Sequence, residues 1–175
     1  TSTCDPNCFF IHPLKIYNTF MLKNKILSFI LFFIITFSAS FIGGAVSINL
    51  KEPWYSTLIK SGLNPPDWVF APVWTILYLM MTIAVWNFWH SKNRDMNTVY
   101  IYFIHIIINT TWSIVFFALH KIFLAMLVLI TLIIFIFLLI IRFKSVNKLS
   151  YYLMIPYLLW CFYALFLNIN LVILN

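Results

Sequence analysis

Residues 54–78 read WYSTLIKSGLNPPDWVFAPVWTILY and join one long apolar segment to the next. The stretch holds three Trp and three Pro within a chain that is otherwise rich in aliphatic residues. Aromatic rings offer a large apolar face with a polar edge, and prolines fix the backbone that carries them. We therefore predict a stiff loop over residues 54–68 that closes the mouth of a cavity for a flat ligand. From Phe70 onward the stretch is expected to be helical.

The composition around this stretch is that of an integral membrane protein. The chain is 63% hydrophobic and only 9% charged. A soluble domain of 175 residues could not cover so much apolar surface. The net charge of +7 comes from scattered basic residues rather than a basic face, so we expect no nucleic-acid partner.

The apolar segments predict an all-α membrane protein. A helix crosses the bilayer with about 20 apolar residues. The sequence therefore predicts a bundle of five transmembrane helices, with a long structured loop between the first two and no separate soluble domain. The predicted spans are 26–50, 70–89, 99–119, 122–141 and 151–174.

The basic residues predict an orientation. Eight Lys and Arg fall on the side that carries the N-terminal segment, and three fall on the opposite side, at Lys51, Lys60 and Lys121. The positive-inside rule then places the N-terminus in the cytoplasm and the C-terminus on the other side. We expect the membrane to be a bacterial cell membrane.

Residues 1–21 differ from the rest of the chain and are expected to be an extension, disordered or non-native, ahead of a five-helix domain over 22–175. Met21, followed by Lys23 and Lys25, could be a native start. Cys4 and Cys8 lie in the extension, and the spacing alone does not make a metal site.

Ionisable groups are nearly absent from the predicted spans. All four acidic residues lie outside them, and His105 is the exception among basic groups. Ion-coupled carriers usually mark their pathway with such groups, and acid–base catalysis needs paired carboxylates. This pattern argues against active transport and against hydrolytic or phosphoryl-transfer chemistry.

Aromatic and amide side chains recur at helical spacing in three predicted spans. Residues three or four apart share a helix face, and three such faces can line a small-molecule pocket. Other interpretations stay open. The amides could hydrogen-bond between helices, and His105 could have a structural role instead of binding haem. Tryptophans near the ends of spans could anchor the protein at the membrane interface. The aligned residues are Trp74 and Tyr78; His105, Asn109 and Trp112; and Tyr157, Trp160, Ala164 and Asn168.

Four motifs, in order, resemble those of the TspO/MBR family of translocator proteins, also called tryptophan-rich sensory proteins or peripheral benzodiazepine receptors. The resemblance covers about residues 26–175. WYxxLxK begins at Trp54, and PPxWVFxPVWTxLY runs from Pro65 to Tyr78. The third-span LNxxWSxxFF pattern spans 108–117 with Ile for its Leu, and PYLLWxxxAxxLN spans 156–168.

The chain departs from the family pattern at four positions. Ser61 replaces the usual Pro, Thr82 a Gly, His105 a Gln and Tyr163 a Phe. The tyrosine-plus-basic cholesterol motif of animal members is missing, which makes a sterol a less suitable ligand.

The resemblance implies a membrane receptor or sensor, usually homodimeric, that binds porphyrins, haem and benzodiazepine-type ligands without a required cofactor. A flat macrocycle would stack on Trp74 and Trp160, with Asn109 at its polar edge. Two alternatives are a transporter of porphyrins or other lipophilic molecules and an enzyme that degrades porphyrin in light, with the same two tryptophans as the catalytic candidates. The implied ligand-binding residues are Tyr55, Pro65, Trp74, Tyr78, Asn109, Trp112, Tyr157, Trp160 and Ala164.

Overall fold

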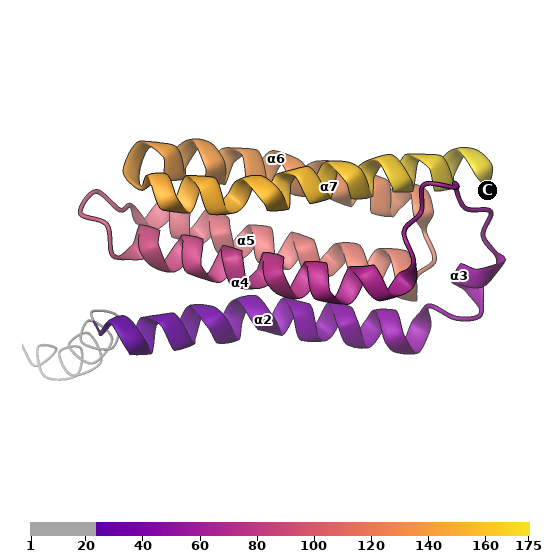
Figure 1. Ribbon diagram of the computed structural model, residues 1–175, viewed down its shortest axis with the longest axis horizontal. Helices are drawn as coiled ribbons and strands as arrows, with labels where there is room; N and C mark the ends of the chain where they lie inside the picture. The colour runs from indigo at the N-terminus through magenta and orange to yellow at the C-terminus, as the bar shows by residue number, and fades with distance from the viewer. Residues whose placement is uncertain (1–23) are drawn as a thin grey trace, which may run out of the picture.

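A computed structural model describes residues 24–175 of the chain (Figure 1). The predicted extension over 1–21, with Cys4 and Cys8, lies outside the described residues. Five helices in the described part are long and apolar enough to cross a membrane, which confirms the predicted five-helix bundle. They are α2 (Lys25–Leu50), α4 (Phe70–Trp89), α5 (Met96–Ser113, continued by the π turn η3, Ile114–Ala118), α6 (Ile122–Val146) and α7 (Lys148–Leu174).

Side-chain caps fix where three of these helices begin. Asn24 Oδ1 accepts hydrogen bonds from the backbone N–H of Ile26 and Leu27 ahead of α2. Asp95 caps α5 and Asn147 caps α7 in the same way. Asn and Asp are preferred at this position because their oxygens satisfy N–H groups that have no partner within the helix. The caps explain why α5 and α7 begin three residues before the predicted apolar spans.

The helices form a closed ring in which each packs against two neighbours. Around the ring the order is α2, α5, α6, α7 and α4, so α4 and α5 both separate α2 from the α6–α7 pair (Figure 1). The connection between α2 and α4 is the long one. It contains the short helix α3 (Trp54–Thr57) and the 3₁₀ turn η2 (Asp67–Val69). We call the end of the bundle that carries residues 51–66 the loop end.

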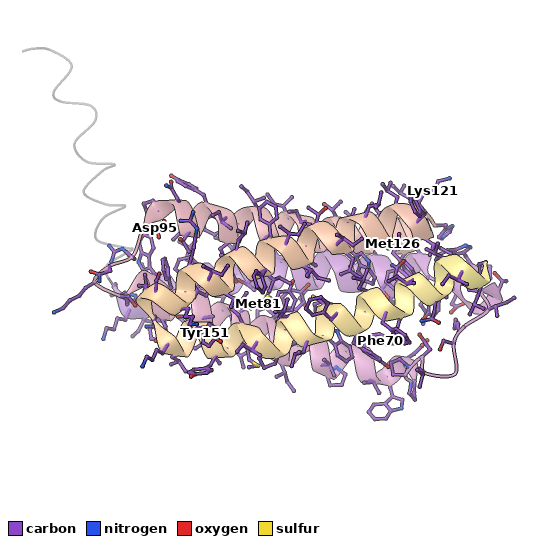
Figure 2. All side chains as sticks on the ribbon, turned by 90° about the horizontal axis from the view of Figure 1, so that it is seen from above. Phe70, Met81, Asp95, Lys121, Met126 and Tyr151 are labelled. Atoms are coloured by element: carbon purple, nitrogen blue, oxygen red, sulfur yellow. The ribbon has the colours of Figure 1, made fainter. Side chains whose placement is uncertain are left out.

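The tightest core lies in the half of the bundle away from the loop end. Met81, Phe88 and Phe143 have no exposed surface there. Figure 2 shows Asp95 and Tyr151 at that end, Lys121 at the loop end and Met81 between them. The outer surfaces of the helices carry exposed aliphatic and aromatic side chains, as expected where a helix faces lipid. The loop half is packed less completely and contains a cavity.

A candidate ligand cavity beneath the loop

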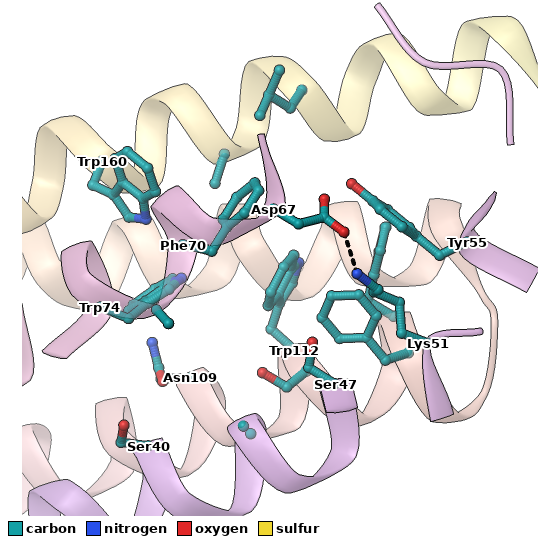
Figure 3. Close-up of a pocket in the computed structure, with 18 of the residues that line it drawn as sticks. Ser40, Ser47, Lys51, Tyr55, Asp67, Phe70, Trp74, Asn109, Trp112 and Trp160 are labelled. Atoms are coloured by element: carbon teal, nitrogen blue, oxygen red, sulfur yellow. Dashed lines mark hydrogen bonds and ion pairs between the residues drawn. The ribbon is translucent and has the colours of Figure 1, made fainter. Parts of the chain in front are cut away.

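The cavity has a volume of about 480 Å³ and lies among four of the helices, beneath the loop (Figure 3). This volume is within the range of pockets that enclose small organic ligands. α6 contributes no side chain to the lining. The lining residues are Ser40, Gly43, Gly44, Ser47 and Ile48 of α2; Lys51, Tyr55, Asn64 and Asp67; Phe70, Ala71, Trp74, Thr75 and Tyr78; Asn109, Trp112, Ser113, Phe116 and Phe117; and Trp160, Tyr163, Ala164, Leu167, Asn168 and Leu171 of α7.

Aromatic rings make up much of the wall. Trp74 lies beside Tyr78 with ring centroids 5.6 Å apart, and Phe70 meets Trp160 edge-on at 6.1 Å. Figure 3 shows Trp112 between Phe70 and Ser47 in the same cavity. Apolar walls with a few polar groups are typical of sites for flat, lipophilic molecules.

Small residues of α2 make up the facing wall. Gly43 brings α2 close to α5, because a Cβ built on it would lie 2.9 Å from Ser113 Oγ. Gly44 has open space beside it, with no atom within 4 Å of a built Cβ. The two adjacent glycines therefore have different roles: Gly43 allows α2 to pack closely against α5, and Gly44 leaves room for the cavity.

A chain of hydrogen bonds closes the cavity toward the middle of the bundle. Tyr78 donates its hydroxyl hydrogen to Asn109 Oδ1, and Asn109 Nδ2 donates to Tyr157 Oη at 3.0 Å. His105 Nε2 pairs with the same Tyr157 oxygen at 3.0 Å. Both ends of the Asn109 amide are thus engaged within the protein.

Tyr55 anchors the loop over the cavity mouth. It is buried, and burial raises the pKa of its phenol, so the hydroxyl stays protonated. The Lys60 ammonium lies 3.9 Å from the centre of the Tyr55 ring, a cation–π contact. Lys51, at the end of α2, forms an ion pair with Asp67 across the mouth (Figure 3).

Two further contacts tie the loop to α7. The Tyr163 hydroxyl donates to the Leu63 carbonyl at 2.7 Å. The Asn175 side chain bonds both backbone groups of Ile59, accepting from its N–H at 2.9 Å and donating to its carbonyl at 3.1 Å. The loop is therefore attached to α7 at two points.

The cavity is also open on one side, between the loop-end halves of α2 and α4. Ile48 of α2 and Ala71 and Thr75 of α4 line the cavity and are exposed, with Ile48 83% exposed. The ring contacts between the two helices lie further from the loop, between Trp89 and Tyr78 of α4. A membrane would place lipid at this opening.

The structure brings most of the predicted site residues together, but not all of them. Tyr157 is fully buried behind Asn109 and does not line the cavity. Pro65 stiffens the loop beside Asn64 without lining the cavity. His105 lies behind Tyr157, so it does not face a ligand in the cavity. The predicted residues that do line it are Tyr55, Trp74, Tyr78, Asn109, Trp112, Trp160 and Ala164.

Several lining residues were not predicted as part of the site. The sequence does contain a pattern that could have identified the α2 wall of the cavity. Ser40, Gly44 and Ser47 recur at helical spacing and share one face of the helix. Phe116 and Phe117 both reach the cavity from η3, where a π turn widens the helix. Their placement depends on that irregular turn, which the sequence pattern does not indicate.

The described chain is thus a five-helix membrane protein with an aromatic cavity beneath its first long loop. The sequence profile of the TspO/MBR family matches residues 29–174. The chain belongs to the TspO/MBR family.

Curated relatives agree with this assignment over most of their length. The chain is 32% identical to the tryptophan-rich protein TspO of Chlorobaculum tepidum over 157 residues, which cover 88% of this chain and 99% of that protein. It is 32% identical to protein CrtK of Rhodobacter capsulatus, over 76% of this chain and 85% of that one. A tryptophan-rich sensory protein of Cereibacter sphaeroides is 30% identical, over 81% and 90% of the two chains. Family membership supports a membrane sensor or receptor role.

Proposed function

We propose that this protein is a membrane receptor or sensor that binds a tetrapyrrole, such as protoporphyrin IX or haem, in the cavity beneath the loop. Benzodiazepine-type ligands, which are also aromatic and largely apolar, would occupy the same space. The observation that carries the proposal is the wall built from Trp74, Trp160 and Phe70, which offers ring faces and edges to a planar guest.

The packing between the cavity and the opposite end of the bundle favours a receptor over a transporter. The Tyr78–Asn109–Tyr157 chain of hydrogen bonds lies at the inner end of the cavity. Beyond it, Met81 and Phe88 are completely buried in the closely packed half. A guest that entered from the loop end would have to break both layers to cross the bundle, whereas binding requires neither to move.

The test is a binding titration on the full chain in lipid nanodiscs. Trp74→Leu combined with Trp160→Leu should weaken protoporphyrin IX binding at least tenfold, because each stacked ring contributes about 0.5–1.5 kcal/mol beyond its buried area. Binding is followed by the shift of the porphyrin absorption band, which does not depend on the tryptophans removed.

Trp68→Leu is the matched control, because Trp68 lies at the same end of the bundle but is 74% exposed and outside the cavity lining. Its affinity should equal that of the unmodified protein. Equal affinity in the double variant and the unmodified protein would overturn the proposal.

A further inference from the structure

Two buried polar groups of the cavity lining have no hydrogen-bond partner within the described protein. They are the Trp112 indole Nε1 and the amide of Asn168, whose oxygen and nitrogen both lack one. Asn168 is only 2% exposed. An unpaired buried amide costs about 1–3 kcal/mol, so a fold rarely keeps one without a use for it.

The two groups belong to the same region of the cavity. Asn168 is one turn from Ala164 and one turn from Leu171 on the cavity face of α7. Leu171 clusters with Phe116, and Trp112 packs against that cluster. Both groups therefore lie on the loop side of Asn109.

The amide that is free to bind a guest is that of Asn168, whereas the sequence pattern predicted Asn109 as the ligand-binding amide. Asn109 gives its oxygen to Tyr78 and its N–H to Tyr157, so it has little left for a guest. Asn168 has no bond that holds its amide in place. The amide can therefore turn toward a guest without breaking a hydrogen bond in the protein.

We infer that Asn168 and Trp112 together bind a carboxyl or carboxamide group of the ligand. The Asn168 amide can donate to an oxygen of such a group and, where the group carries an O–H or N–H, accept a second hydrogen bond from it. The Trp112 indole can only donate, and it would bond the same oxygen. On a tetrapyrrole this group is the carboxyl of a propionate side chain, so the inference rests on the function proposed above.

The test compares two porphyrins on the full chain in nanodiscs. Protoporphyrin IX carries two propionic acid side chains, and etioporphyrin has the same ring with alkyl groups only. Asn168→Leu should weaken protoporphyrin binding about tenfold, because hydrogen bonds contribute about 0.5–1.5 kcal/mol each, and should leave etioporphyrin binding within about twofold. Trp112→Phe should act in the same direction with a smaller effect.

Asn170→Leu is the control, because the Asn170 amide donates to the Phe166 carbonyl of its own helix and does not line the cavity. It should change neither affinity. Thermal unfolding without ligand provides a second readout. Asn168→Leu should unfold at the same temperature as the unmodified protein or higher, since it removes an unpaired amide.

The outcomes separate this inference from the proposed function. If the unmodified protein binds both porphyrins and Asn168→Leu weakens them equally while lowering the unfolding temperature, Asn168 has a structural role and the inference fails alone. Unchanged protoporphyrin binding in both Asn168→Leu and Trp112→Phe also overturns it alone. If the unmodified protein binds neither porphyrin, the proposed function and the inference fail together.

Discussion

Gly43 and Gly44 are adjacent in the sequence, but their surroundings predict different effects of the same substitution. A Cβ on Gly43 would meet Ser113 at 2.9 Å, whereas one on Gly44 meets nothing within 4 Å. Gly43→Ala should be about 1 kcal/mol less stable than Gly44→Ala, because α2 or Ser113 must shift to admit the new methyl group. Gly44→Ala should be neutral or slightly stabilising, because alanine favours a helix. Thermal unfolding of the two variants in the same detergent measures the difference.

Ser113→Ala supplies the check on this explanation. Combined with Gly43→Ala, it removes the hydroxyl that the new methyl group meets and should restore most of the lost stability. Two glycine variants of equal stability would show that the close approach of α2 to α5 is unimportant.

Asp95 predicts a pH-dependent contribution to stability at the end away from the loop. Burial opposes its ionisation, but hydrogen bonds from Thr98 and the charge of Arg142 outweigh that effect, so its pKa lies below the ordinary value of 3.8. The ionised carboxylate therefore favours the folded state above that value, and this contribution is lost as the pH falls through the lowered pKa. Asp95→Ala should cost about 1 kcal/mol at neutral pH through loss of the cap.

Asp95→Asn separates the cap from the charge, because its amide oxygen can still accept the hydrogen bond of the Thr98 N–H. This variant should retain most of the stability at neutral pH. The small advantage of the carboxylate should disappear in acid. Denaturant titrations of both proteins at several pH values measure this difference in the free energy of unfolding. If the difference grew in acid, the ionised Asp95 carboxylate would not be the source of the pH dependence.

At the scale of the elements, one hydroxyl group helps to hold the loop against α7, and it belongs to a residue that departs from the family pattern. Tyr163 stands where a Phe is usual, and its hydroxyl bonds the Leu63 carbonyl. Tyr163→Phe removes this one contact. Amide hydrogen exchange of residues 58–66 should then become about two- to tenfold faster, as expected for one hydrogen bond of about 0.5–1.5 kcal/mol. Tyr152→Phe, at an exposed tyrosine near the other end of α7, should leave the exchange unchanged.

The elements also show what the sequence could and could not predict. Hydropathy alone predicted five spans, because a bilayer requires long apolar helices wherever the chain crosses it. The motifs predicted most of the aromatic wall. They could not distinguish Asn109, whose amide is paired at both ends, from Asn168, whose amide is paired at neither, because each lies at helical spacing on a face that carries a tryptophan. That difference depends on which tyrosines the neighbouring helices bring within reach.

For the whole molecule, the distribution of basic residues predicts the orientation. The helix bounds put Lys92, Arg94 and Lys144 at one end and Lys51, Lys60 and Lys121 at the loop end. The positive-inside rule places the loop end outside the cytoplasm. A cysteine at Gly62, which is exposed and has open space around it, should react in intact cells with a reagent that does not cross membranes.

Cys4 and Cys8 are replaced by Ser in that experiment, and the buried Cys161 can remain. A cysteine at Lys92, in the connection between α4 and α5, should react only after the cells are opened. Reaction of Gly62→Cys only in opened cells would reverse the orientation.

The opening between α2 and α4 has a consequence for how binding to this protein is measured. A cavity that opens toward lipid equilibrates with guest dissolved in the bilayer, where a lipophilic molecule is far more concentrated than in the surrounding water. The apparent dissociation constant, expressed per litre of solution, should then rise in proportion to the lipid or detergent added. The same data, expressed as moles of guest per mole of lipid, should give one constant value.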